Sequence, residues 1–170
     1  MSAHVAIGLG ANLGGPLEAL RAAVDAIDAL PTTTVLVVSD VFRTDPVGGP
    51  PGQPEYANAA VLIETSLAPR ALLRELQRIE AEAGRERLVH HGPRTLDLDI
   101  LWWQGRVIHE PDLQVPHPRL FERRFALEPL IDVLPEPQFT EAVSALPDQG
   151  ARRLGPLLDA TIGTILPEEG

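Results

Sequence analysis

The 170-residue chain contains no cysteine and no lysine. The absence of cysteine excludes disulfides, thiolate zinc sites and cysteine nucleophiles, and it is consistent with a reducing compartment. Because lysine is also missing, all 14 basic residues are arginine, which excludes Schiff-base chemistry and the lysine of a P-loop. Arginine still permits planar, bidentate recognition of phosphate. Any phosphate-binding cluster in this protein must therefore be built from arginine.

Long apolar runs and positive net charge are missing as well. No segment reaches the roughly eighteen consecutive apolar residues of a membrane span, and the first ten residues lack the pattern of a secretion signal. The formal net charge of −10 disfavours general binding to nucleic acid or anionic membranes, because both require a basic surface. We therefore expect a cytoplasmic protein with neither kind of partner. We also expect a monomer, although no sequence feature bears on the oligomeric state.

The overall composition is that of a globular domain. Hydrophobic residues make up 44% of the chain and charged residues 22%, so the chain can bury a core. Its length predicts one domain over residues 1–170. Within it, the segment from about 135 to 170 is rich in proline and weakly patterned, and we expect it to form a poorly defined C-terminal extension.

Apolar periodicity predicts strands and helices in alternation. We expect a glycine-rich turn at 10–15, a helix cap at Gly84, a turn at Gln104-Gly105 that pairs the last two strands, and a break at Pro129. Two strand–helix units and a hairpin predict an α+β fold, a ferredoxin-like sandwich in which helices pack on a mainly antiparallel sheet. The predicted strands are 5–9, 33–42, 59–65, 97–103 and 106–109, and the predicted helices are 16–30, 69–83 and 120–134.

Two acidic residues form the strongest chemical signal. In the run 97–101, Asp97 and Asp99 alternate with apolar residues, so on a strand both carboxylates point to one face, about 6–7 Å apart. Two like charges held so close favour a cation between them, and hard oxygen ligands suit Mg²⁺. The alternative is an exposed edge strand whose acids only deter aggregation.

Basic residues precede this acidic pair. Arg85, Arg87 and Arg94 lie in a polar, non-periodic segment, which we expect to be a loop. Guanidinium groups beside a metal site are suited to a triphosphate, because they bind phosphate oxygens while Mg²⁺ neutralises the remaining charge. Alternatively, these arginines pair in solvent with the glutamates of residues 80–86.

A second polar cluster spans residues 115–124. Its His117 could donate a hydrogen bond to phosphate, and Arg123 could reach the same site from the start of a helix. The alternative is that His117, which lies between two prolines, is simply a turn residue.

The segment from Thr44 to Asn58 is the third candidate for part of a functional site. Its proline and glycine content would form a wall of exposed backbone groups that could recognise a flat heterocycle, with Tyr56 and Asn58 at its far end. An ordinary long connection is the alternative.

The run His91-Gly92-Pro93-Arg94-Thr95-Leu96-Asp97-Leu98-Asp99-Ile100-Leu101 resembles the signature of the 6-hydroxymethyl-7,8-dihydropterin pyrophosphokinases. Three more segments are similar to this family: Ile7–Leu13 resembles its first strand and turn, Phe42–Thr44 with Gln53–Val61 its pterin loop and following strand, and Val115–His117 a turn of its ATP site. The resemblance extends from about residue 4 to 134.

The resemblance implies a ferredoxin-like α+β fold, ATP as co-substrate and two Mg²⁺ ions bridged by Asp97 and Asp99. It implies transfer of pyrophosphate from ATP to a pterin alcohol in folate biosynthesis, with AMP as the other product and Arg85, Arg87 and Arg94 assisting. Matching positions imply a pterin site of Thr44, Pro46, Val47, Tyr56, Asn58 and Phe125, in which Tyr56 and Phe125 sandwich the ring. They imply an ATP site of Gln77, Glu80, Arg85, Arg87, Arg94, Ile100, His117 and Arg123.

Two other functions remain open at this point. A non-catalytic ferredoxin-like module could use the same pocket for ligand sensing, although Arg94 and the intact acidic pair argue against it. A metal-dependent phosphohydrolase would release phosphate from ATP without a pterin. The products formed from ATP and the pterin alcohol distinguish all three.

Overall fold

A computed structural model describes residues 2–12, 16–44, 56–88 and 95–157, without the side chains of 85–88 and 95. Within these ranges no helix is both long and apolar enough to cross a membrane. The elements in chain order are β1 (Ala3–Asn12), α1 (Pro16–Asp28), β2 (Thr33–Val38), β3 (Asp40–Thr44), β4 (Tyr56–Thr65), α2 (Pro69–Leu88), β5 (Thr95–Trp103), β6 (Ile108–Glu110), β7 (Leu113–Val115), the 3₁₀ helix η1 (Leu120–Glu122), α3 (Arg124–Val133), α4 (Pro137–Ser144) and β8 (Arg152–Pro156).

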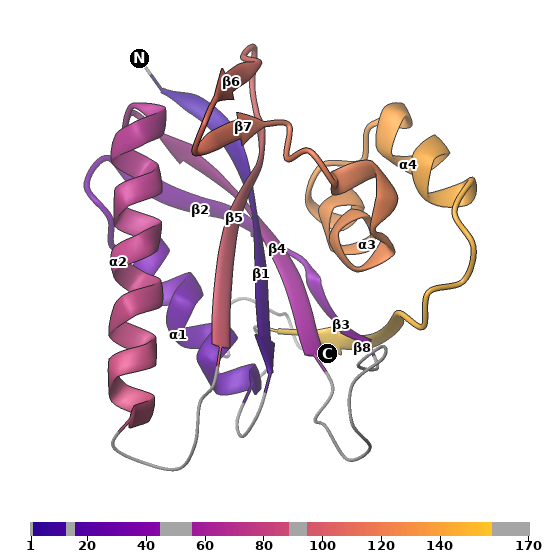
Figure 1. Ribbon diagram of the computed structural model, residues 1–170, viewed down its shortest axis with the longest axis horizontal. Coiled ribbons are helices and arrows are strands. Elements are labelled where there is room, and N and C mark those ends of the chain that lie inside the picture. Colours follow the sequence, from indigo (N-terminus) through magenta and orange to yellow (C-terminus); the bar gives the residue numbers. More distant parts are fainter. Residues whose placement is uncertain (1, 13–15, 45–55, 89–94, 158–170) are drawn as a thin grey trace.

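The main sheet has the strand order β5-β1-β4-β3-β8, and β2 also pairs with β4. Its described pairings are all antiparallel. Helices α1 and α2 cover one face of the sheet, and α3 and α4 lie on the other (Figure 1). This arrangement confirms the predicted α+β sandwich.

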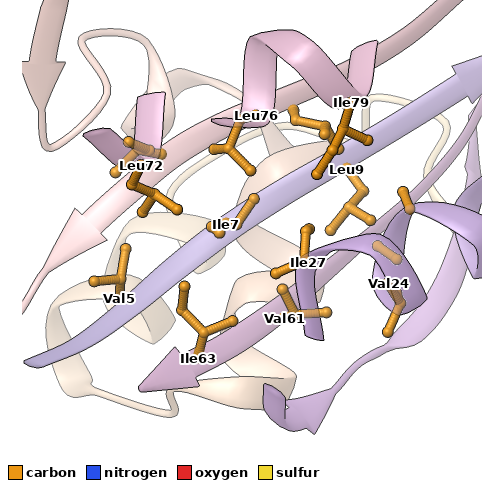
Figure 2. Packing of buried hydrophobic residues seen from close by; sticks show 14 of the residues in the cluster. Val5, Ile7, Leu9, Val24, Ile27, Val61, Ile63, Leu72, Leu76 and Ile79 are labelled. Carbon is orange, nitrogen blue, oxygen red and sulfur yellow. The ribbon is translucent and has the colours of Figure 1, made fainter. Parts of the chain in front are cut away.

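The face under α1 and α2 carries the larger core. Alternate residues of the central strand β1, Val5, Ile7 and Leu9, pack toward these helices (Figure 2), as the two-residue period of a strand requires. They meet Val61 and Ile63 of the neighbouring strand β4. The helical partners, spaced three or four residues apart, are Val24 and Ile27 of α1 and Leu72, Leu76 and Ile79 of α2.

The described residues cover the opposite face only in part. Ala6 of β1 and Leu101 of β5 pack there against Leu127 and Leu130 of α3, with Phe139 of α4 behind them. Farther along β1 the residues on this face are glycine rather than apolar side chains. The sheet therefore offers an uncovered floor next to the start of α3.

Three local predictions in the first half of the chain are wrong. Strand β1 continues through Gly10 to Asn12, so the turn does not begin at Gly10. The predicted single strand 33–42 is divided at Ser39, whose hydroxyl accepts a hydrogen bond from the Ala60 N–H at 2.8 Å and donates one to the Asp40 carbonyl at 2.6 Å. Helix α2 runs past Gly84 to Leu88, so Gly84 is not a cap.

The second half also differs from the predictions. The predicted 120–134 helix breaks at Arg123, which is extended between η1 and α3, whereas Pro129 lies inside α3. Strand β6 pairs with β7 rather than with β5, and the predicted turn at Gln104-Gly105 is followed by an isolated bridge between Trp103 and Arg106, before β6 begins. Residues 137–144 and 152–156 of the expected extension form α4 and β8. Phe139 of α4 is buried in the core under α3, and β8 pairs with β3 at the edge of the sheet.

Candidate active site

A pocket of about 820 Å³ lies between the uncovered floor of the sheet and the start of α3. Its walls come from β1, β3, β4, β5 and the segment between β7 and α3. Eight residues singled out from the sequence line it, although they come from positions spread over more than eighty residues: Thr44, Tyr56, Asn58, Asp97, Asp99, His117, Arg123 and Phe125.

The floor of the pocket is made by two glycines of β1. Gly10 lies between Asn58 on β4 and Asp97 on β5, and Gly8 lies opposite Asp99. A Cβ on Gly10 would stand 3.1 Å from the Asn58 Oδ1, closer than an ordinary van der Waals contact. Glycine thus keeps an open surface between the acidic pair and the Asn58 amide.

We expect Gly10→Ala to weaken ligand binding while the sheet still forms. The added methyl group must displace the Asn58 side chain, and overpacking of this kind costs about 1–3 kcal/mol. Titration with the pterin substrate should show a Kd raised by about tenfold or more. Gly84→Ala is the matched control, since the new methyl group meets no described residue outside its own turn of α2 within 4 Å; a Gly10→Ala variant that binds like wild type would contradict this account of the floor.

Asp97 and Asp99 share one face of β5, as their alternation predicted. Leu98 and Ile100 enter the core under α2, whereas both carboxylates are exposed in the pocket. Partial burial raises the pKa of Asp97, and the negative charge of Asp99 raises it further. The site therefore holds two carboxylates at a cost that a cation would relieve.

These two carboxylates suit Mg²⁺ better than a metal ion whose ligands all come from protein side chains. Among the described side chains no group of three or more His, Cys, Asp or Glu is arranged to hold a metal ion. Mg²⁺ is typically bound through one or two carboxylates together with waters and substrate phosphates. The exposed acidic pair therefore suits a magnesium ion that arrives with a phosphate-bearing ligand.

Glu80 lies beside the acidic pair but does not line the pocket. Its Oε2 accepts a hydrogen bond from the Leu98 N–H at 2.7 Å, which satisfies a backbone donor of β5, the first strand in the order of the sheet. Burial raises the pKa of Glu80, and the charges of Asp97 and Asp99 raise it further. Glu80 thus anchors α2 to the strand that carries the acids.

His117 is held at the pocket wall as a neutral hydrogen-bond donor. Its backbone N–H donates to the Leu101 carbonyl at 3.2 Å, and its Nδ1 accepts from the Arg119 N–H at 3.3 Å. Burial lowers the pKa of His117; Asp99 opposes this shift, whereas the positive charges of Arg123 and Arg119 reinforce it. With Nδ1 accepting, the proton of the neutral ring is on Nε2, which can donate to an anionic ligand.

The side of the pocket near β3 and β4 is aromatic and amide-bearing. Asn58 is only 6% exposed, and its Nδ2 donates to the Thr44 Oγ1 at 3.1 Å. Tyr56 and Phe125 are half-buried and line the same pocket. The guanidinium carbon of Arg123 lies 5.4 Å from the centre of the Phe125 ring, so the basic and aromatic parts of the pocket are in contact.

The remaining predicted residues are not placed in the pocket. The side chains of Gln77, which is exposed on α2, Glu80, and Ile100, which is buried in the core, do not line it. Arg85 and Arg87 belong to α2 rather than to a loop, and their side chains lie outside the described ones. Pro46, Val47 and Arg94 fall entirely outside the described residues.

Sequence reasoning missed other residues of the pocket. Gly8 was placed in a predicted strand and Gly10 in a turn, yet their two-residue spacing on an apolar strand is the signal of a strip without side chains on one face. Arg119, Glu122 and Gln149 also line the pocket. Nothing in the sequence pattern pointed to Gln149, because its position depends on the path of the C-terminal segment.

Comparison with known proteins gives consistent matches along most of the chain. The sequence model of the family described as 7,8-dihydro-6-hydroxymethylpterin-pyrophosphokinase (HPPK) matches residues 6–135. A 2-amino-4-hydroxy-6-hydroxymethyldihydropteridine pyrophosphokinase from Pseudomonas aeruginosa is 41% identical over 160 residues, which is 91% of this chain and 98% of the relative. The protein of the same name from Haemophilus influenzae is 44% identical, over 88% of this chain and 97% of its own length. The one from Bacillus subtilis is 45% identical, over 87% of this chain and 87% of its own length.

A solved structure shows the same fold. A triple mutant of HPPK-DHPS from Plasmodium falciparum superposes with a TM-score of 0.61 at 15% identity, over 80% of this chain and 41% of the Plasmodium chain. At this identity the likeness concerns the fold alone.

Proposed function

The chain belongs to the 7,8-dihydro-6-hydroxymethylpterin-pyrophosphokinase family, and we propose that the pocket over Gly8 and Gly10 is where its reaction takes place. The chain transfers pyrophosphate from ATP to 6-hydroxymethyl-7,8-dihydropterin in folate biosynthesis. The observation that carries the proposal is the shared pocket, in which the exposed acidic pair faces the same cavity as the Asn58 amide and two aromatic rings.

We assign the phosphate end of the pocket to Asp97, Asp99, His117 and Arg123. The two carboxylates would hold two magnesium ions, which neutralise phosphate charge and make the substrate hydroxyl more acidic when bound. His117, neutral for the reasons given above, donates from Nε2 to a phosphate oxygen, and the Arg123 guanidinium adds charged hydrogen bonds. Neither residue needs to gain or lose a proton during the transfer.

Further ATP contacts are assigned from the family resemblance. Arg85, Arg87 and Arg94 would bind the phosphates during transfer, and Arg94 has the strongest claim because it lies within the signature run. The resemblance also assigns Gln77, Glu80 and Ile100 to the nucleotide, so any contact they make would lie beyond the described pocket. For Glu80, its hydrogen bond to the Leu98 N–H supports a place beside the strand that carries the acids.

The opposite end is assigned to the pterin. Thr44, Pro46 and Val47 would line the slot, Tyr56 and Phe125 would stack on the two faces of the ring, and Asn58 would pair with its polar edge. Stacking supplies affinity, and a buried amide gives discrimination because a ligand without matching groups leaves it unpaired. The 3.1 Å hydrogen bond to Thr44 supports this role, since it fixes the direction of the Asn58 amide.

The transfer itself is an in-line displacement. The hydroxymethyl oxygen of the pterin bonds to the β-phosphorus of ATP while the bond from that phosphorus to the α,β-bridging oxygen breaks. AMP departs with the bridging oxygen, the β- and γ-phosphoryl groups remain on the pterin, and the hydroxyl proton passes to water. The protein residues contribute by alignment and charge stabilisation, so no covalent enzyme intermediate forms.

We also propose a single catalytic domain that acts in the cytoplasm as a monomer, without nucleic-acid or membrane partners. The net charge of −10 supports the absence of polyanionic partners, and the absence of cysteine is consistent with a reducing compartment.

Product analysis tests the proposed function. Purified protein mixed with ATP, Mg²⁺ and the reduced pterin alcohol should yield AMP and a diphosphorylated pterin in equal amounts, measured by mass spectrometry. Release of ADP or free phosphate without pterin would identify a phosphohydrolase. Heat stabilisation by both ligands without any product would identify a binding module.

A further inference from the structure

The junction between η1 and α3 carries two residues of the pocket on either side of one backbone amide. Arg123 and Phe125, assigned to ATP and to the pterin, flank Arg124, the first residue of α3. Arg123 is extended, with φ −124° and ψ 109°, and its side chain does not cap the helix. The first N–H groups of a helix have no partner within it, so the Arg124 N–H requires one from elsewhere.

That partner is Gln149, which reaches the junction from 25 residues away. Its Oε1 accepts a hydrogen bond from the Arg124 N–H at 2.8 Å, and its Nε2 donates to the Glu122 carbonyl at 3.2 Å. One side-chain amide therefore bridges the last residue of η1 and the first residue of α3. Its two bonds lie on either side of Arg123 and hold that residue extended.

The side chain of Arg124 returns contacts to the segment that carries Gln149. Its Nε donates to the Pro147 carbonyl at 2.9 Å, and its Nη2 donates to the Leu146 carbonyl at 3.3 Å. Its Nη1 bonds to Glu128 of α3 at 2.6 Å. Three hydrogen bonds thus run from Arg124, the first residue of α3, to the segment 146–149, and a fourth runs from Gln149 to Glu122 at the end of η1.

We propose that Gln149 is a positioning residue for both substrates, acting through Arg123 and Phe125. Gln149 borders the pocket, but both polar atoms of its side chain are engaged with the junction, so it need not touch a ligand. Because the Arg123 guanidinium also lies over the Phe125 ring, a shift of the junction moves the two side chains together. This inference rests on the proposed function of the pocket.

The test compares Gln149→Ala and Gln149→Met with wild type in steady-state kinetics. The methionine side chain keeps the length and the packing of glutamine but makes neither hydrogen bond, so it separates bonding from shape. We expect the KM for ATP and the KM for the pterin to rise together by about tenfold in both variants, the scale of a lost hydrogen bond. The melting temperature should stay within about 4 °C of wild type.

Gln138→Ala is the matched control, because Gln138 is an exposed residue of α4 whose side-chain amide donates to Glu136 of the same segment at 2.8 Å; its two KM values should equal those of wild type. Unchanged KM values in both Gln149 variants, or a rise for one substrate alone, would overturn the inference. So would a lower melting temperature with normal KM values, which marks a purely structural residue. Failure of the proposed function is distinguishable, because wild type would then form no AMP and no pterin diphosphate in the same assay.

Discussion

Asp97→Asn and Asp99→Asn should each lower kcat by about a thousandfold or more, because a metal ion contributes several kcal/mol of charge stabilisation to the transition state. The amide keeps the size of each side chain but removes the anionic oxygen ligand that Mg²⁺ requires. Single-turnover measurement of AMP formation, at saturating ATP and Mg²⁺, isolates this loss from effects on product release.

The same substitution at Asp97 should not destabilise the fold. The pKa of Asp97 in the folded protein lies above its ordinary value. At pH above both the folded and the unfolded pKa, the ionised carboxylate therefore destabilises the folded state. This destabilisation disappears as pH falls through the folded pKa. At neutral pH, without metal or ligand, Asp97→Asn should therefore melt at the same temperature as wild type or higher. A core residue would show the opposite pattern.

Asp25→Asn provides the control for both measurements. Asp25 is exposed on α1, the helix layer on the other side of the sheet (Figure 1), so kcat and melting temperature should both remain at wild-type values. If Asp97→Asn and Asp99→Asn retained activity close to that of Asp25→Asn, the acidic pair would not be the metal site.

Asn58→Ala should lower kcat/KM for the pterin by about two powers of ten, with a much smaller change in the KM for ATP. When the amide is removed, the ligand loses its hydrogen bond to the site. The polar group of the ligand still has to leave water on binding, and nothing in the site now offsets that cost. Asn58 is nearly inaccessible to solvent, so water would replace its amide poorly.

Thr44→Val is the companion variant. It removes the oxygen that accepts from the Asn58 Nδ2 but leaves the amide present, so we expect a smaller loss of about tenfold, the scale of one hydrogen bond. Competition binding with each substrate separately would measure both effects. Equal weakening of ATP and pterin, or no weakening in Asn58→Ala, would remove the pterin assignment of this end of the pocket.

The sequence predicted those features that depend on local periodicity. Alternation alone placed Asp97 and Asp99 on one face with Leu98 and Ile100 on the other, as the structure shows. Apolar periodicity over residues 69–83 likewise predicted a helix, and Leu72, Leu76 and Ile79 of α2 face the core. Both patterns report directly on which side of an element faces the core.

Features set by distant partners escaped prediction. The break between β2 and β3 depends on the bonds of Ser39 to β4, and the break at Arg123 depends on Gln149. Strand β8 forms because β3 offers it an edge to pair with, although its own sequence has little apolar alternation. In each case a contact made across the fold overrides a weak local preference.

The central claim is that Asp97 and Asp99 bind the cations that accompany a nucleotide, and anomalous diffraction tests it most directly. Crystals grown with Mn²⁺ and an ATP analogue that has a methylene group between the α- and β-phosphorus should show two anomalous peaks. Each peak should lie about 2.0–2.3 Å from carboxylate oxygens of this pair and from phosphate oxygens of the analogue. Bound nucleotide without a metal peak at either carboxylate, or metal held elsewhere in the pocket, would contradict the account.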